Sequence, residues 1–162
     1  MTFERITGSM TTQRGTDGSI AARMPAFFAN KNGVDQINIG SGVPTLVTWA
    51  ETFDTNNNFA ANRFTPTVQG IYYLNFQWTI TNSVDQTSLI ASILKNGNAI
   101  AEGRIQSSGI NRHTVKIKAI ILANGVTDFF EAQVVQSSGF NQNISGVLSE
   151  TFWFGFRFMG NQ

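Results

Sequence analysis

Apolar and polar residues alternate along several segments of this chain, with a period of two that is typical of half-buried strands. The clearest segment is 70–81. One side of this segment, drawn as an extended chain, carries Tyr72, Leu74, Phe76 and Trp78. The other side carries Ile71, Tyr73, Asn75 and Gln77. Segment 112–122 alternates in the same way, with Val115, Ile117, Ala119 and Ile121 on one side. No segment sustains a helical period.

Further strand signals follow one another with turn residues between them. The predicted strands are 24–29, 45–53, 88–94, 99–106, 127–136 and 151–159. Pro25 favours an edge position for the first of them, because proline cannot donate to a sheet ladder. Asn96-Gly97 predicts a type I′ hairpin, and Asn124-Gly125 predicts a second turn into 127–136. Many short strands separated by turns predict an all-β sandwich or barrel in one domain.

Composition narrows the function classes. Charged residues make up 13% of the 162 positions, about half the usual ~25%, and the 14 Phe favour strands. The 11 Lys and Arg are scattered and the net charge is +1, so we expect no nucleic-acid partner. The absence of Cys excludes disulfides and thiolate chemistry. We expect no membrane insertion and no secretory signal, because no apolar run reaches about 20 residues and residues 1–20 lack a hydrophobic segment.

The stretch from about Val43 to Phe158 carries a set of ordered motifs. It contains Phe53, then Phe59-Ala60-Ala61-Asn62-Arg63-Phe64, Pro66 and Gly70-Ile71-Tyr72-Tyr73-Leu74-Asn75-Phe76. Leu94-Lys95-Asn96-Gly97, Leu122-Ala123-Asn124-Gly125-Val126 and Ser149-Glu150-Thr151-Phe152-Trp153-Phe154-Gly155-Phe156 follow. In this order the motifs resemble the complement C1q-like globular domain of the C1q and tumour necrosis factor superfamily. Leu74 stands where the family pattern has Phe.

The resemblance implies an all-β, ten-strand jelly roll over residues 23–160 that assembles as a homotrimer and has no catalytic site. Residues 1–22 are polar and dotted with glycine, so we expect an extended arm that cannot fold alone. A short chain of this type, without Cys and without a collagen stalk, resembles the C1q-like proteins of bacteria and bacteriophages.

The alternating faces give expected places for individual side chains. The predicted core contains Tyr72, Leu74, Phe76, Trp78, Phe152, Phe154, Phe156 and Phe158. The predicted trimer interface, on the opposite faces of the same strands, contains Ile71, Tyr73, Ile120, Leu122 and Trp153. These residues would form an exposed apolar patch on a monomer, and such patches mark interfaces.

The sequence offers few residues that could form a catalytic or metal-binding site. His113 is the only histidine. It could belong to a Ser-His-Asp triad, or three copies could form a metal site on a trimer axis, but we favour a purely structural role. The pairs Glu51/Asp54 and Asp128/Glu131 do not provide the six to eight oxygen ligands of a calcium site. We therefore expect no enzyme, no metal and no cofactor, with calcium as the one option left open.

The expected function is that of a trimeric structural or recognition module of a bacteriophage virion, as a fibre head, spike or capsid decoration. The arm would attach it to other virion proteins. Three loops would meet a host-surface glycan or protein, because loops on rigid scaffolds carry binding. These loops are 81–87, 106–112 and 136–146. The alternative is an extracellular adhesion module of a bacterial surface or spore coat.

Overall fold

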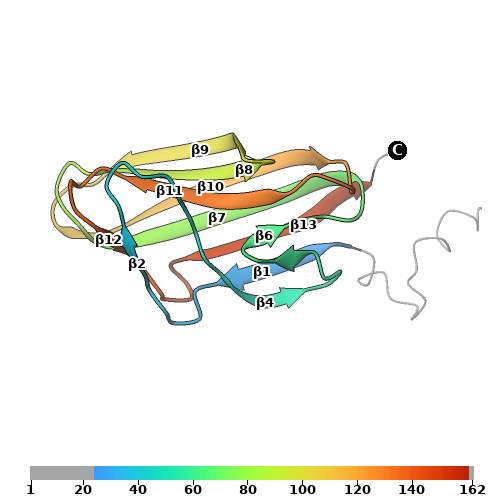
Figure 1. The fold of residues 1–162 in the computed structure, drawn as a ribbon, viewed down its shortest axis with the longest axis horizontal. Coiled ribbons are helices and arrows are strands. Elements are labelled where there is room, and N and C mark those ends of the chain that lie inside the picture. Colours follow the sequence, from blue (N-terminus) through green and yellow to red (C-terminus); the bar gives the residue numbers. More distant parts are fainter. Residues whose placement is uncertain (1–23, 161–162) are drawn as a thin grey trace, which may run out of the picture.

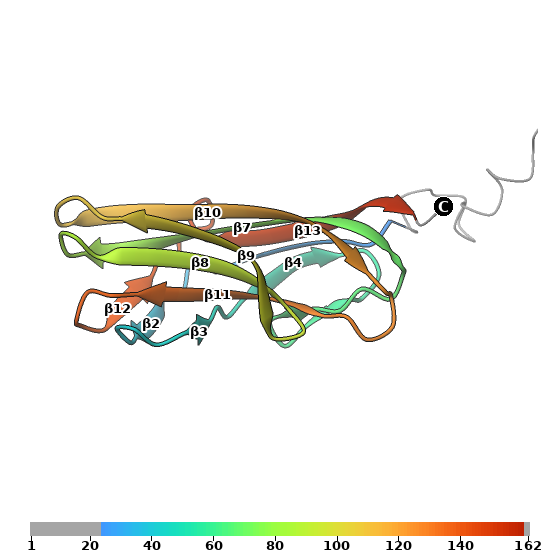
Figure 2. The same ribbon diagram turned by 90° about the horizontal axis from the view of Figure 1, so that it is seen from above.

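The computed structural model describes residues 24–160, and for 159 and 160 the backbone only. This part of the chain forms thirteen strands in two antiparallel sheets that face each other across one core (Figures 1 and 2). The predicted all-β fold is thus confirmed. No helix in this part of the chain could span a membrane. The predicted arm, 1–22, lies outside the described residues.

Sheet A contains seven strands and holds most of the long ones. Its order is β2-β12-β7-β13-β1-β4, and β10 pairs with the free side of β7. The bounds are β1 Ala26–Asn30, β2 Gln36–Ile39, β4 Ala50–Asp54, β7 Gly70–Ser83, β10 Asn111–Ala123, β12 Gln142–Ile144 and β13 Phe152–Gly160.

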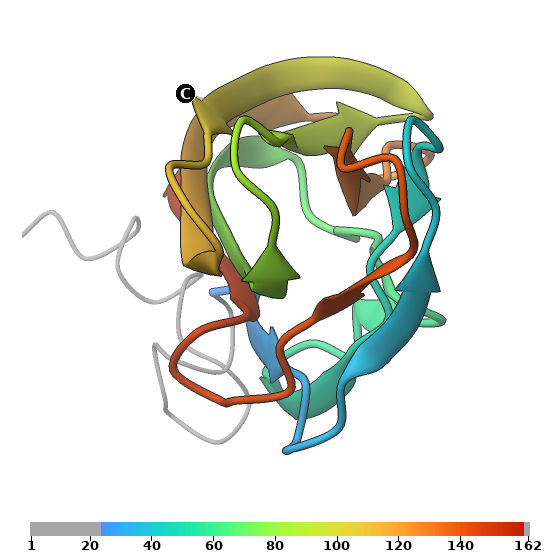
Figure 3. The same ribbon diagram turned by 90° about the vertical axis from the view of Figure 1, so that its left-hand side faces the viewer.

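Sheet B contains six strands in the order β5-β6-β11-β8-β9, with β3 paired to β11. The bounds are β3 Thr45–Leu46, β5 Phe59–Ala60, β6 Arg63–Phe64, β8 Ser88–Lys95, β9 Asn98–Gln106 and β11 Phe130–Gln136. Three of the thirteen strands have two residues, so ten are longer, as the resemblance implied. Figure 3 looks along the strands and shows the two sheets enclosing the core.

The predicted face of β7 is the buried one. Tyr72, Leu74, Phe76 and Trp78 are all at most 1% exposed, as the alternation requires. The tight β8–β9 turn is also confirmed, because Asn96 (φ 53°) and Gly97 (φ 81°) both have the positive φ of a type I′ hairpin.

Two strand-level predictions were wrong. β1 is interior, between β13 and β4, because Pro25 lies before the strand and removes no ladder hydrogen bond. Segment 45–53 is split: β3 belongs to sheet B and β4 to sheet A, so the chain changes sheet between them. The predicted turn at Asn124-Gly125 is present, and it joins β10 in sheet A to β11 in sheet B.

The two faces of β13 are the reverse of the prediction. Trp153 is fully buried, while Phe154 and Phe156 are half-buried on the outer face of sheet A. The reason is the register with β7: Phe156 lies opposite Tyr73, and Trp153 lies opposite Phe76. Side chains opposite each other in a ladder share one face, so Phe156 follows Tyr73 outward and Trp153 follows Phe76 into the core.

Gly155 shows why the core accepts this arrangement. It also faces inward, where an added Cβ would lie 2.5 Å from Leu74 Cδ2 and 2.8 Å from Phe27 Cε1. The inner face of β13 therefore presents one large side chain beside one empty position. The indole of Trp153 lies 4.9 Å from the Phe27 ring, edge to face, in the space around that position.

Candidate functional site

The outer face of sheet A carries a continuous apolar surface, which we call the aromatic face. It consists of Phe28, Phe53, Ile71, Tyr73, Ile120, Leu122, Phe152, Phe154 and Phe156. The strands that supply these side chains are β1, β4, β7, β10 and β13, so the face runs across most of the sheet.

The face is built from rows of side chains that lie opposite one another on neighbouring strands. One row contains Ile120, Tyr73 and Phe156. The next contains Lys118, Asn75, Phe154, Phe28 and Phe53. A third contains Lys116, Gln77, Phe152 and Asn30. The surface therefore changes from apolar near the chain termini to polar toward the opposite end.

Aromatic rings at the centre of the face stack on one another. The Tyr73 ring lies 5.3 Å from Phe156 and 6.1 Å from Phe154, between ring centroids. Phe28 lies 6.5 Å from Phe154 and 6.3 Å from Phe53. The planes are inclined by 15–39°, which is the offset-stacked range of favourable aromatic pairs. Neighbouring rings thus hold each other in one orientation.

The face remains accessible to water in the single chain. Ile120 is 68% exposed, Leu122 50% and Phe53 49%. The outer face of sheet B is more polar, since Ile90, Leu94 and Val135 alternate there with Ser92, Glu102, Arg104, Glu131 and Gln133. Single exposed apolar side chains are normal, but a contiguous patch marks a contact surface.

Four of the five predicted interface residues lie on this face: Ile71, Tyr73, Ile120 and Leu122. Trp153 does not. The sequence prediction missed Phe28 and Phe53, and misplaced Phe152, Phe154 and Phe156 in the core. Shared parity grouped these three rings correctly on one face of the strand, but it did not show which face is buried. Phe28 and Phe53 could not be found in this way, because they join the face only through pairing between distant strands.

The polar end of the outer face is held by an ion pair between Arg112 and Glu150. Arg112 also donates to Ser145 Oγ over 2.7 Å, and Ser145 Oγ donates to Glu150 Oε2 over 2.5 Å. The hydrogen bond from Arg112, and next that from Ser145, lower the pKa of Glu150 below its ordinary value of 4.5. This cluster fastens the start of β10 to the loop before β13.

Glu150 should make stability depend on acid pH. Its lowered pKa contributes stability that is present above pH 4.5 and lost as the pH falls through the folded-state pKa. Glu150→Gln should therefore flatten the decrease in unfolding free energy below pH 4.5, measured by urea denaturation at pH 7, 5, 4 and 3. Glu102→Gln is the control, since its ion pair with Arg104 is exposed and should contribute little. An unchanged slope for Glu150→Gln would contradict the prediction.

Three of the four carboxylates considered as calcium ligands have structural partners: Asp54, Asp128 and Glu131. Asp128 pairs with Lys95 at 2.9 Å, and Glu131 pairs with Arg63 at 2.8 Å. Asp54 accepts the Phe59 N–H over 2.6 Å. Burial alone would raise the pKa of Asp128, but hydrogen bonds from Lys95, Asn96 and Asn124 and the charge of Lys95 lower it on balance. Within residues 24–160 no cluster of three metal-ligating side chains occurs.

His113 is held between two serines. Its Nδ1 lies 2.7 Å from Ser83 Oγ, and its Nε2 accepts the Ser108 N–H over 3.3 Å. Ser83 Oγ donates to the Asn111 carbonyl over 2.8 Å, which leaves its oxygen to accept from Nδ1. This pattern fixes the Nδ1–H tautomer and leaves no imidazole nitrogen to take the Ser83 proton. It fits a structural histidine rather than a nucleophile's base.

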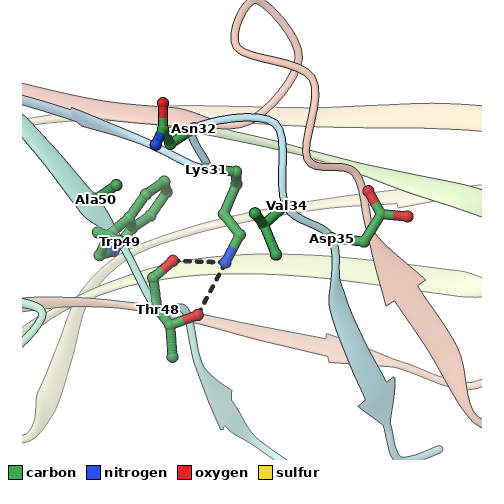
Figure 4. A pocket seen from close by; sticks show the side chains of 7 residues that line it. All are labelled: Lys31, Asn32, Val34, Asp35, Thr48, Trp49 and Ala50. Carbon is green, nitrogen blue, oxygen red and sulfur yellow. Dashed lines mark hydrogen bonds between the residues drawn. The ribbon is translucent and has the colours of Figure 1, made fainter.

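A shallow pocket of about 260 Å³ contains the one buried lysine amine of the described chain (Figure 4). Lys31 Nζ donates to the Thr48 carbonyl over 2.7 Å and to Thr48 Oγ1 over 2.8 Å. Burial lowers the pKa of Lys31, and the charge of Asp35 opposes that effect. Because the amine is engaged by Thr48, it holds the segment that crosses between the sheets and is not directed at a ligand.

Comparisons with known structures define the class of fold. Murine APRIL at pH 5.0 superposes with a TM-score of 0.62 at 12% sequence identity, covering 83% of this chain and 98% of that one. Eiger TNF from S. frugiperda superposes with a TM-score of 0.55 at 13% identity, covering 86% and 94%. No protein-family model and no curated protein sequence matches the chain. The chain has the jelly-roll fold of the C1q and TNF type, and this likeness concerns the fold alone.

Proposed function

We propose that this chain is a non-enzymatic structural or recognition module that assembles as a homotrimer through its aromatic face. The observation that carries the proposal is the row of Ile120, Tyr73 and Phe156 on a sheet whose inner side already has a full core. Ile120 is 68% exposed, and the half-buried rings of Tyr73 and Phe156 lie 5.3 Å apart between centroids. Removing such a surface from water favours association by about 25 cal/mol for each Å² buried.

A second copy of the same chain is the partner that the fold favours. The superfamily resemblance implies three protomers around one axis. Such closed symmetry buries the aromatic face on every copy, whereas an open array would leave it exposed on the copies at its ends. The more polar outer face of sheet B would remain in water. Engagement of Asp128, Glu131, Glu150 and His113 in structural contacts supports the non-enzymatic part of the proposal.

Sedimentation equilibrium of the purified full chain tests the assembly. We expect the mass of three chains at micromolar concentration, because interfaces with stacked aromatic residues at their centre hold much of their binding energy there. A mass of one chain under the same conditions would contradict the proposal.

Within this class, we propose that the module belongs to a bacteriophage virion, where residues 1–22 attach it to other virion proteins. The support is the resemblance to short phage and bacterial C1q-like domains, together with the placement of the chain ends. The first described strand begins and the last one ends at the same end of the molecule, since Ala26 lies opposite Phe156 (Figure 1). The loops 84–87, 107–110 and 137–141 lie at the other end.

Antibody labelling of purified particles and of cells from a culture that produces the protein tests this location. A label on the particles supports the virion role. A label on cells or spores, with none on particles, would favour the alternative, an adhesion module of a bacterial surface or spore coat.

A further inference from the structure

The loop between β11 and β12, residues 137–141, lies at the end of the molecule away from the start of β1 and the end of β13 (Figure 1). Phe140 in this loop is 67% exposed. It does not belong to the aromatic face, which lies on the outer side of sheet A. An exposed phenylalanine on a loop either has no binding role or is part of a ligand-binding site.

The backbone of the loop is held by hydrogen bonds from the fully buried side chain of Gln136. Gln136 is 0% exposed, and its Nε2 donates to the Phe140 carbonyl over 2.7 Å and to the Ile39 carbonyl over 2.9 Å. Its Oε1 accepts the Ser138 N–H over 2.7 Å. Both N–H donors and the oxygen of this buried amide are therefore engaged, two of these bonds go to the loop and one to β2, and a buried amide left unsatisfied would be costly.

Further contacts hold the residues on either side of the ring. Ser138 Oγ donates to the Phe140 carbonyl over 3.0 Å. The Gly139 N–H donates to Ser41 Oγ over 2.9 Å, and Gly139 has a φ of 82°, which a residue with a side chain rarely adopts. These contacts orient the backbone so that Phe140 projects outward instead of folding onto the sheet edge.

Such a loop loses little conformational entropy when it binds. Rigid aromatic side chains on ordered loops give contact area at a small entropic cost, which is the principle of many recognition surfaces. Single exposed apolar residues are otherwise unremarkable on protein surfaces. The difference here is that a fully buried glutamine, a serine and a positive-φ glycine all act on the backbone that carries the exposed ring.

The loop that carries Phe140 is polar and uncharged, since no ionisable side chain occurs between Gln136 and Glu150. Its residues Ser137 and Asn141 are exposed. The Ser137 N–H donates to the Ser88 carbonyl, so loop 84–87 lies beside this loop and brings the exposed carboxylate of Asp85, while loop 107–110 is uncharged. Amide and hydroxyl groups beside an aromatic ring suit a sugar, whose ring has an apolar C–H face and a rim of hydroxyls. The lack of a cationic group argues against acidic sugars and phosphates.

We propose that loop 137–141 binds a neutral carbohydrate, with the C–H face of one sugar ring stacked on Phe140 and its hydroxyls bonded by Asn141 and Ser137. The inference names a ligand class for the recognition role proposed above. In a trimer the loop is present three times at one end, so weak single-site binding is strengthened on a multivalent surface.

Binding of the fluorescently labelled full chain to a printed array of neutral and sialylated oligosaccharides tests the proposal, with variants Phe140→Ala, Phe140→Tyr and Val126→Ala. Val126 is the matched control, since it is 80% exposed in the loop between β10 and β11. We expect binding to neutral oligosaccharides. Phe140→Ala should weaken it by about tenfold or more, as for an aromatic hot spot. Phe140→Tyr, which keeps the ring, and Val126→Ala should stay within about threefold.

Three results of the array experiment would contradict carbohydrate binding by loop 137–141. Binding to no oligosaccharide, binding only to sialylated ones, or equal binding by Phe140→Ala and the wild type each overturns the proposal. Sedimentation of the same samples separates this result from the assembly question. A trimer that binds no sugar refutes the ligand class alone, and a monomer that still binds through Phe140 refutes the trimer alone.

Discussion

Trp153→Ala is expected to lower the unfolding free energy of the protomer by about 3–5 kcal/mol, the usual loss for a fully buried tryptophan. The indole is 0% exposed. Its ring centroid lies 4.9 Å from that of Phe27, 5.7 Å from that of Phe59 and 6.1 Å from that of Trp49. Its Nε1 has no hydrogen-bond partner within the described residues, so the loss is one of packing and cavity formation. Total stabilities of about 5–15 kcal/mol make such a change severe.

Urea denaturation followed by far-UV circular dichroism measures this loss. Phe156→Ala is the matched control on the same strand, because its ring is half-buried on the outer face and should cost the single protomer far less. Each substitution should be measured in the otherwise wild-type protein and again in a protein that also carries a substitution that dissociates the trimer, since association adds to apparent stability. A large loss for Phe156→Ala beside a small one for Trp153→Ala would mean that the two faces of β13 are assigned the wrong way.

Phe154→Asp is expected to leave a folded protomer and abolish the trimer at micromolar concentration. Phe154 lies at the centre of the aromatic face, with ring centroids 6.1 Å from Tyr73, 6.3 Å from Phe152 and 6.5 Å from Phe28. A carboxylate there meets water in the monomer but would be buried without a cation in the assembly. Burying an unpaired charge costs several kcal/mol, enough to reduce association by orders of magnitude.

Sedimentation velocity with circular dichroism on the same samples separates assembly from folding. Val126→Asp is the control, because Val126 is 80% exposed outside the aromatic face and should tolerate the charge in both states. A Phe154→Asp protein that sediments as a trimer would show that the aromatic face is not the contact between protomers. The same sample with lost strand signal would instead place Phe154 in the core.

The sequence by itself determined the fold class and the orientation of the central strand. On β7, one side carries only aromatic and aliphatic residues, while the other mixes Ile71 and Tyr73 with Asn75, Gln77 and Thr79, so the side that faces the core follows from alternation. The β8–β9 hairpin was equally readable, because only residues that tolerate positive φ suit its two central positions, and Asn96-Gly97 supplies them. These features are local, and local physics decides them.

The orientation of β13 was decided only by the tertiary structure. Both faces of this strand carry aromatic residues. One face has Phe152, Phe154 and Phe156, and the other has Trp153 beside Gly155 and Arg157, so the alternation shows two faces without showing which is buried. The choice depends on the register with β7 and on the close approach of Leu74 and Phe27 to Gly155. The same holds for the aromatic face, which unites Phe53, Phe28, Phe154 and Tyr73 from four strands. Pairing between segments far apart in the chain is a property of the packed molecule, and no local pattern encodes it.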